Sequence, residues 1–320
     1  MNTTAPAPEP AARAHGPWWI TAAVYFVATC LLHLQFSLWL VRPRETPWGR
    51  HALSELMPAA IVVGGVLLAL LVLRQLRRAP RPAPLAAGWL LWLLAVAGID
   101  RWLTFSANEY FHYPQYALLA WLVARALDPA RDHPTPGRVL FWVTLAGAAD
   151  EVLQYLWITT NYSDYLDFND MLVNLVAGAG GLLLYYGQPP NAAPAPRKTR
   201  RGWRAEGAAI VALLLAAGTA IAAGRLALAP AGEVPPGGVA RDTQGRATLY
   251  LQRSIDQYGR WHSGPRRGRY RVLTPDEALA ALLLAGAAFT ALLRAAAGGA
   301  TQPREDTAAT ISPSNAGKSR

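Results

Sequence analysis

The sequence predicts an all-α polytopic membrane protein with about eight transmembrane helices in a bundle and a small extracytoplasmic β-meander between helices 7 and 8. Of its 320 residues, 52% are hydrophobic and only 16% are charged, which is too little charge for an ordinary soluble domain. The apolar residues come in long blocks rather than at a helical or strand period. Blocks of roughly 18 or more apolar residues match a helix that crosses a ~30 Å hydrocarbon core.

Eight such blocks follow one another along the chain, and each predicts one membrane-spanning helix. They cover residues 18–41, 56–73, 85–103, 110–127, 139–158, 168–187, 208–228 and 278–297. The ends of the chain, 1–16 and 299–320, are rich in Ala, Pro, Ser and Thr, which predicts disordered cytoplasmic tails. A basic cytoplasmic linker, 188–204, divides a six-helix bundle (17–187) from two further helices with the segment between them (205–298).

The positive charge of +10 is explained by topology rather than by nucleic-acid binding. Arginine and lysine concentrate in the loops after helices 2, 4 and 6, and few lie in the loops after helices 1, 3 and 5. Because basic loops stay in the cytoplasm, both termini of this multi-pass protein are expected there. The lone cysteine, Cys30, excludes an intramolecular disulfide.

The polar segment at about 230–275 lies between the last two helices. ATLYLQRS, RWHS and RYRVL read as short extended pieces separated by the turns DQYG and GPRRG, which predicts the β-meander. Its arginines and aromatic residues fit either a solvated basic sheet or a surface that touches lipid phosphates or envelope polymer. At its end Thr274 and Pro275 are suited to the start of the eighth helix.

Two carboxylates stand inside the fifth predicted helix, in the stretch AADEVLQY. At 1.5 Å per residue, Asp150 lies roughly 17 Å from the start of that helix, just beyond the middle of the membrane. An acid near a helix centre costs about 2.5–3.5 kcal/mol, so such residues face a bundle interior or a wet cavity. Asp150 and Glu151 are therefore our candidate acid–base residues, with His112 as their partner.

Other polar side chains are expected at the same depth, in the outer half of the membrane. We infer a polar pocket, open outward and lined by helices 3 to 6, with AGAGG in helix 6 permitting close packing beside it. The expected lining residues are Asp100, Arg101, Glu109, Gln115, Tyr116, Gln154, Tyr155, Asp167, Asp170 and Asn174.

Some of these residues also have a purely structural interpretation. Ser106 and Glu109 form the S-x-x-E pattern of a capping box, and Asp167 and Asp170 could cap the sixth helix. Glu109 and His112 match the Glu-x-x-His of di-iron bundles, but that site needs two such motifs and more carboxylates. We therefore predict no metal and no cofactor.

Three motifs resemble the VanZ-like family of bacterial membrane proteins over about residues 98–187. They are His112 ahead of Tyr116, then Glu151-x-x-Gln154, then Asp170-x3-Asn174-x3-Gly178. The resemblance implies a small helical bundle in the bacterial cytoplasmic membrane. The founding member of the family is associated with reduced susceptibility to teicoplanin-type glycopeptides, so a link to glycopeptide resistance or envelope homeostasis is expected.

The chain departs from the family pattern at two places. Gln115 stands where the family often has an acid, and the stretch 158–168 lacks the arginine that often lies between the glutamine and the aspartate motif. Arg101 is the nearest substitute, and we expect it to pair with Glu151 or Asp170.

Three classes of function remain open from the sequence. The first is binding or modification of an amphiphilic envelope ligand, such as a lipid-linked precursor or a lipoglycopeptide, entering from the outer leaflet. The second is a proton-linked transporter in which the acids relay protons, and the third is a non-catalytic membrane assembly factor. No nucleophile–base–oxyanion set is readable, so the sequence does not decide whether the protein is an enzyme.

Overall fold

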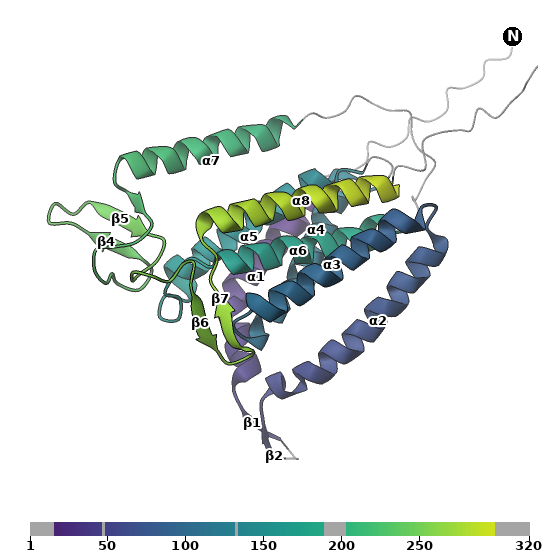
Figure 1. Cartoon of the computed structure of the whole chain (residues 1–320), viewed down its shortest axis with the longest axis horizontal. Helices are drawn as coiled ribbons and strands as arrows, with labels where there is room; N and C mark the ends of the chain where they lie inside the picture. The colour runs from purple at the N-terminus through teal and green to yellow at the C-terminus, as the bar shows by residue number, and fades with distance from the viewer. Residues whose placement is uncertain (1–15, 47–48, 132–133, 189–202, 298–320) are drawn as a thin grey trace, which may run out of the picture.

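The computed structural model describes residues 16–46, 49–131, 134–188 and 203–297, and over these ranges the chain is mostly helical (Figure 1). Each of the eight predicted apolar blocks forms a helix. The helices are α1 (Gly16–Val41), α2 (Met57–Arg78), α3 (Pro82–Trp102), α4 (His112–Leu127), α5 (Pro136–Leu153), α6 (Phe168–Tyr186), α7 (Arg204–Ala222) and α8 (Pro275–Ala297).

Six of the helices in the described ranges are long and apolar enough to cross a membrane: α2, α3, α5 with the π-helical turn that extends it (Gln154–Ile158), α6, α7 and α8. This confirms a helical multi-pass membrane protein. The 16-residue α4 and the apolar stretch Gly16–Leu32 of α1 are shorter than these six.

Short-range signals set several helix ends where the sequence placed them. Ser106 and Glu109 form a complete capping box on a 3₁₀ turn (Ala107–Phe111) that leads into α4. Pro114 lies in the first turn of α4, where backbone N–H groups have no intrahelical acceptor, so it does not kink the helix. At the start of α8, the backbone N–H of Glu277 donates to Thr274 Oγ1 (3.3 Å), and the backbone N–H of Thr274 donates to Glu277 Oε2 (3.1 Å).

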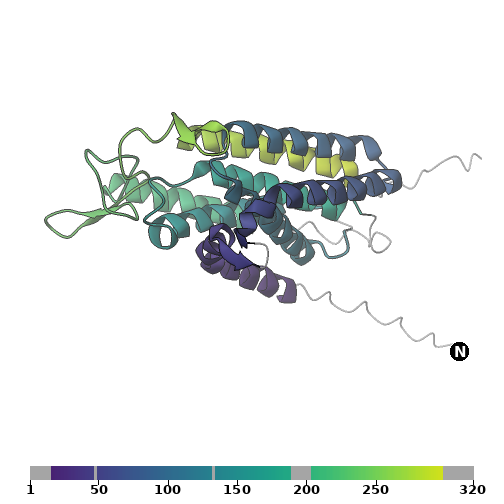
Figure 2. The same ribbon diagram turned by 90° about the horizontal axis from the view of Figure 1, so that it is seen from below.

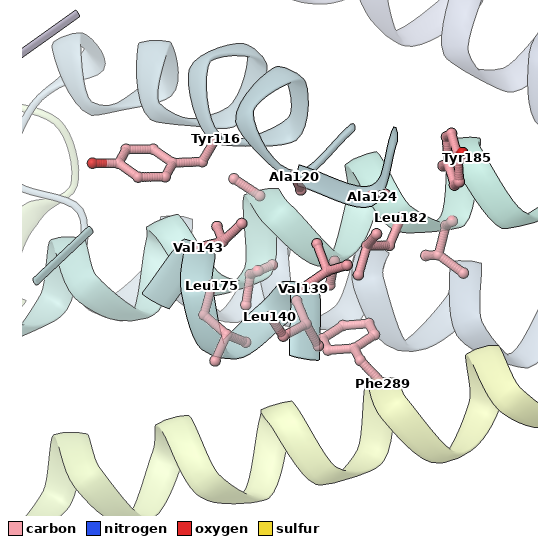
Figure 3. Packing of buried hydrophobic residues seen from close by; sticks show 14 of the residues in the cluster. Tyr116, Ala120, Ala124, Val139, Leu140, Val143, Leu175, Leu182, Tyr185 and Phe289 are labelled. Atoms are coloured by element: carbon pink, nitrogen blue, oxygen red, sulfur yellow. The ribbon is translucent and has the colours of Figure 1, made fainter. Parts of the chain in front are cut away.

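Helix α6 lies at the centre of the bundle, in contact with α3, α4, α5 and α8 (Figures 1 and 2). Almost all of its residues are buried, and the core around it is built from apolar side chains of α1, α3, α4, α5 and α8, part of which Figure 3 shows. The small residues of AGAGG allow this close approach, and Gly180 leaves room for the indole of Trp92, whose Nε1 donates to the carbonyl of Val176 (2.9 Å).

Helix α8 packs against α3, α5 and α6, and its Phe289 and Leu293 are fully buried. It therefore belongs to the same bundle as the helices before the 188–204 linker. Helices α2 and α7 lie at the periphery, where large apolar side chains such as Val62, Leu70 and Leu214 are exposed. In a membrane these faces meet lipid, which removes the cost of leaving them uncovered.

Helix α7 is tied to the bundle by one buried carboxylate near its start. Glu206 is fully buried, and its Oε1 accepts from Arg138 Nε at 2.7 Å and from Trp142 Nε1 at 3.0 Å. Because both donors meet the same oxygen, a glutamine at this position could still accept both bonds.

We expect Glu206→Gln to lower the free energy of unfolding by about 1 kcal/mol, the share that comes from the charge of the pair. This loss is measured by unfolding the wild type, E206Q, R138Q and the double variant in detergent. The double variant should lose less than the sum of the single variants, because the two residues are coupled. Strictly additive stability losses in the double variant would contradict a direct interaction between Glu206 and Arg138.

The segment between α7 and α8 is rich in strands, but it does not form one meander. β3 (Leu226–Ala227) pairs parallel to β5 (Ala247–Tyr250), which pairs antiparallel to β4 (Val239–Arg241), while β6 (Trp261–Gly264) and β7 (Gly268–Arg271) form a separate hairpin. Strands β5, β6 and β7 lie where the sequence predicted extended pieces. β3 and β4 were not predicted, β3 lies inside the predicted seventh helix, and the expected continuous pairing is wrong.

The physical reason lies in the chain between β5 and β6. Gln252 pairs with Tyr165, from the loop between α5 and α6, and the Gln252 side chain accepts from the backbone N–H groups of Gln257 and Tyr258 (3.1 and 3.3 Å). The chain after β5 is therefore held by the bundle and by its own turn, and it does not fold back onto β5.

A further hairpin, β1 (Arg44–Thr46) with β2 (Gly49–His51), joins α1 to α2. We call the end of the bundle that carries strands β1 to β7 the strand end; it holds the connections α1–α2, α3–α4, α5–α6 and α7–α8. The predicted tails and nearly all of the 188–204 linker lie outside the described residues.

Candidate functional site

Three helices bring four polar side chains together at the strand end of the bundle. We call them the buried cluster: His112, which is the first residue of α4, Glu151 in the last turn of α5, and Asp170 and Asn174 in the first two turns of α6. His112, Glu151 and Asn174 are 2%, 3% and 0% exposed, and the Asp170 side chain is 14% exposed. The expected pocket is thus nearly closed by its own side chains, and Asp170 is its most accessible member.

Asn174 links the histidine to the glutamate. Its Oδ1 lies 2.7 Å from His112 Nδ1, and its Nδ2 donates to Glu151 Oε1 at 3.5 Å. Gln154 Nε2 donates to the same Glu151 oxygen, also at 3.5 Å. On its other side, His112 Nε2 lies 3.7 Å from Asp170 Oδ2.

This arrangement fixes the tautomer of the histidine. Because the Asn174 amide nitrogen faces a carboxylate, its oxygen must face His112, so Nδ1 of the histidine is the protonated nitrogen that donates. In the neutral imidazole the lone pair then sits on Nε2, which is directed toward Asp170.

Asp150, although adjacent to Glu151 in sequence, faces a different partner. It is fully buried, and its Oδ2 accepts from the hydroxyl of Tyr116 at 2.8 Å. The ring of Tyr116 stacks on that of His112, with centroids 6.0 Å apart and planes 5° from parallel. Successive residues of a helix point about 100° apart, which explains why the two acids separate.

Asp167 and Glu109 border the buried cluster as caps, as the structural interpretation expected. Asp167 Oδ1 accepts from the backbone N–H groups of Asn169 (2.8 Å) and Asp170 (3.3 Å) at the start of α6. Burial, reinforced by the charge of Asp170, raises the pKa of Asp167 to about 8. Burial and the same neighbour also raise the pKa of Glu109 well above its usual value.

The expected pairing of Arg101 with Glu151 or Asp170 is wrong. Arg101 is exposed and forms no ion pair with either acid. Its neighbour Asp100 instead turns inward and accepts from Arg266 Nε at 2.7 Å (Oδ1) and from Arg267 Nη2 at 2.6 Å (Oδ2), with Tyr110 as a third donor. Position 101 lies on the outer face of α3, so its side chain cannot reach the cluster.

Two other expected lining residues lie apart from the buried cluster. Tyr155 donates to the carbonyl of Tyr250 at 2.6 Å and so anchors strand β5 to the bundle. Gln115 is half-buried beside α1, and its backbone carbonyl accepts from Tyr25 at 3.1 Å.

Three contributors were missed from the sequence. Arg266 and Arg267, in the turn of the β6–β7 hairpin, bind Asp100, and Asn169 holds the start of α6 to the end of β7 by donating to the Arg271 carbonyl at 2.7 Å. The signal for the arginines was Asp100 itself, because an acid at the end of an apolar helix requires a cation. No local pattern pointed to Asn169.

The basic residue beside the carboxylates of the buried cluster is a histidine, His112. Over the described parts of the chain, no arginine or lysine pairs with Asp150, Glu151 or Asp170. Buried acids in such surroundings take up a proton, bind a cation or meet a cationic or hydrogen-bonding ligand. The cluster can therefore exchange protons or bind ligands.

Comparison of the chain with protein-family models, with curated proteins and with solved structures finds no match.

Proposed function

We propose that the protein is a VanZ-like multi-pass protein of the bacterial cytoplasmic membrane, with both termini in the cytoplasm. Its buried cluster binds or modifies an amphiphilic envelope ligand, such as a lipid-linked precursor or a lipoglycopeptide, that enters from the outer leaflet. The observation that carries the proposal is the convergence of His112, Glu151, Asp170 and Asn174 from three helices at one end of the bundle. Each of the three motifs on which the resemblance depends contributes at least one of these residues.

The surroundings of the cluster support an amphiphilic ligand whose phosphate lies on the β6–β7 hairpin and whose hydrogen-bonding groups reach the acids. The β6–β7 hairpin presents arginines beside aromatic rings; Arg269 lies 4.9 Å from the ring centre of Trp261, and Arg266 lies 4.5 Å from that of Tyr110. Guanidinium groups bind phosphates, and aromatic side chains favour the membrane interface. A headgroup could therefore rest on the hairpin while its acyl chain lies against the apolar helices.

The test is the lipid that the protein retains during purification. Glu151→Gln keeps the size and hydrogen-bonding capacity of the side chain and removes its charge, so the fold should persist while the retained ligand is lost. The exposed Glu233 of the strand segment provides the matched control, E233Q. Mass spectrometry of lipids bound to wild type, E151Q and E233Q in native-lipid discs compares them.

We expect one lipid class to be enriched in wild type and E233Q and reduced by about tenfold or more in E151Q, the effect of losing roughly 1.4 kcal/mol of binding. An identical lipid profile in all three proteins, with unchanged melting temperatures, would contradict the proposal. A pH-gradient-driven flux in vesicles that E151Q abolishes would favour the proton-linked transporter instead. Loss of folded E151Q protein would favour a purely structural role for the cluster.

A further inference from the structure

Three metal-ligating side chains converge in the buried cluster. One ligating atom each of His112, Glu151 and Asp170 lies within 4.8 Å of the other two. They come from α4, α5 and α6, so the packing of three helices brings them together and no sequence motif contains them. The Glu-x-x-His pair considered in the sequence shares only His112 with this set.

The histidine is already oriented for ligation. Asn174 holds Nδ1–H through a 2.7 Å hydrogen bond, so the Nε2 lone pair is directed toward Asp170 Oδ2, 3.7 Å away. A lone pair and a carboxylate oxygen repel each other unless a proton or a cation lies between them. Histidine ligands commonly donate their other N–H to an oxygen acceptor in this way, which fixes the ring and the tautomer.

The acids offer the charge and the oxygen atoms that a cation needs. Among the described residues, Asp170 Oδ1 is buried and has no hydrogen-bond partner, and the two hydrogen bonds that Glu151 Oε1 accepts are both long, at 3.5 Å. Two carboxylates with a neutral imidazole carry a charge of about −2, which a divalent ion offsets. Asp150 is directed to Tyr116 and is not part of the set.

We propose that His112, Glu151 and Asp170 bind a divalent transition-metal ion, Zn²⁺ or Mn²⁺. One nitrogen and two oxygen donors suit these ions, and three protein ligands leave a coordination position for water or for an anionic ligand. Ligands of a tetrahedral ion lie about 3.4 Å apart. The 3.7 Å between His112 Nε2 and Asp170 Oδ2 is close to this value, and the ligating atom of Glu151 lies within 4.8 Å of those of the other two residues.

The site uses the residues of the proposed function but does not depend on the envelope ligand. The test is therefore a metal measurement on untagged, full-length protein in detergent, stripped with a chelator and titrated with Mn²⁺ or Zn²⁺. We expect saturable binding of about one ion per chain, with a higher melting temperature in the bound form. The Mn²⁺ electron paramagnetic resonance spectrum should show coupling to one imidazole nitrogen.

Matched variants assign the site. H112Q and D170N remove ligands and should weaken binding by about a hundredfold or more. N174L removes no ligand but removes the hydrogen bonds that support His112 and Glu151, and should weaken binding by about tenfold to a hundredfold. His262 bonds to the Gln257 carbonyl at 2.8 Å outside the buried cluster, so H262Q should bind the ion as wild type does.

Three results would overturn the cation site: no saturable binding by the wild type, undiminished binding by folded H112Q, or a bound Mn²⁺ without nitrogen coupling. The spectrum of the wild type decides the matter even where a variant does not fold. Lipid retention is measured separately, so a protein that retains its lipid but binds no ion disproves the cation site alone. A protein that binds the ion but retains no lipid disproves the envelope ligand alone.

Discussion

Gly181→Ala should prevent α6 from packing against α4. A Cβ added at position 181 would lie 2.2 Å from the carbonyl oxygen of Ala117 and 2.8 Å from its carbonyl carbon and Cα. These are backbone atoms, so no side-chain rotation relieves the clash and the two helices must separate. We expect a loss of about 3 kcal/mol or more in the free energy of unfolding, because α6 is the centre of the core.

Two other glycines provide a graded control. Gly65 on α2 has no atom within 4 Å of an added Cβ, so G65A should be neutral or stabilise the helix by up to about 1 kcal/mol. At Gly180 the nearest atom, at 2.6 Å, belongs to the side chain of Trp92, which can move at some cost. Unfolding in detergent should therefore show G65A as the most stable of the three variants, G180A as less stable and G181A as the least stable. Equal stability of G65A and G181A would contradict the close contact between α6 and α4.

Asp100→Asn should release the β6–β7 hairpin from the bundle. Asp100 uses one oxygen for Arg266 and the other for Arg267, so the amide nitrogen of an asparagine must face one of the two guanidinium groups. Glu206, by contrast, receives both of its donors on one oxygen. The Asp100 and Arg266 side chains are 16% and 25% exposed, so we expect a cost of about 2 kcal/mol rather than that of a fully buried pair.

Limited proteolysis with trypsin measures this release. Trypsin cleaves after arginine, so the bonds after Arg266 and Arg267 are cleavage sites in the hairpin itself. If cleavage follows local opening, about 1.4 kcal/mol corresponds to tenfold faster cutting at these two bonds in D100N. Asp242 makes a comparable 2.6 Å bond to Arg246 on an exposed turn, so D242N is the control and should leave the hairpin protected. Equal cutting of D100N and wild type would show that Asp100 does not hold the hairpin.

The same proteolysis in spheroplasts tests the proposed orientation. Trypsin added outside the cell should reach Arg266 and Arg267 in D100N, because the strand end is proposed to face outward. Protection of these bonds in intact spheroplasts, together with cleavage in inverted vesicles, would show that the strand end faces the cytoplasm and would contradict the proposed orientation.

The position of the buried cluster along the helices follows from the sequence, whereas the directions of its side chains do not. The depth of Glu151, His112, Asp170 and Asn174 followed from counting residues along helices that alternate in direction, and the structure places these residues together at the strand end. Counting along a helix does not give the direction of a side chain around its axis. For that reason Asp100 and Arg101, both expected to line the pocket, instead bind the β6–β7 hairpin and face outward, respectively, and Asp150 separates from Glu151.

The sequence by itself determined the eight helices, several of their caps and the positions of β5, β6 and β7, because apolar run length, capping and turn residues act over a few neighbouring residues. Only the tertiary structure decided which strands pair, which side chains face inward and which acids meet His112. Those features depend on contacts between segments far apart in the chain, such as Arg267 with Asp100, whose energies no local pattern records. The candidate cation site belongs to this second group, since each of its three ligands comes from a different helix.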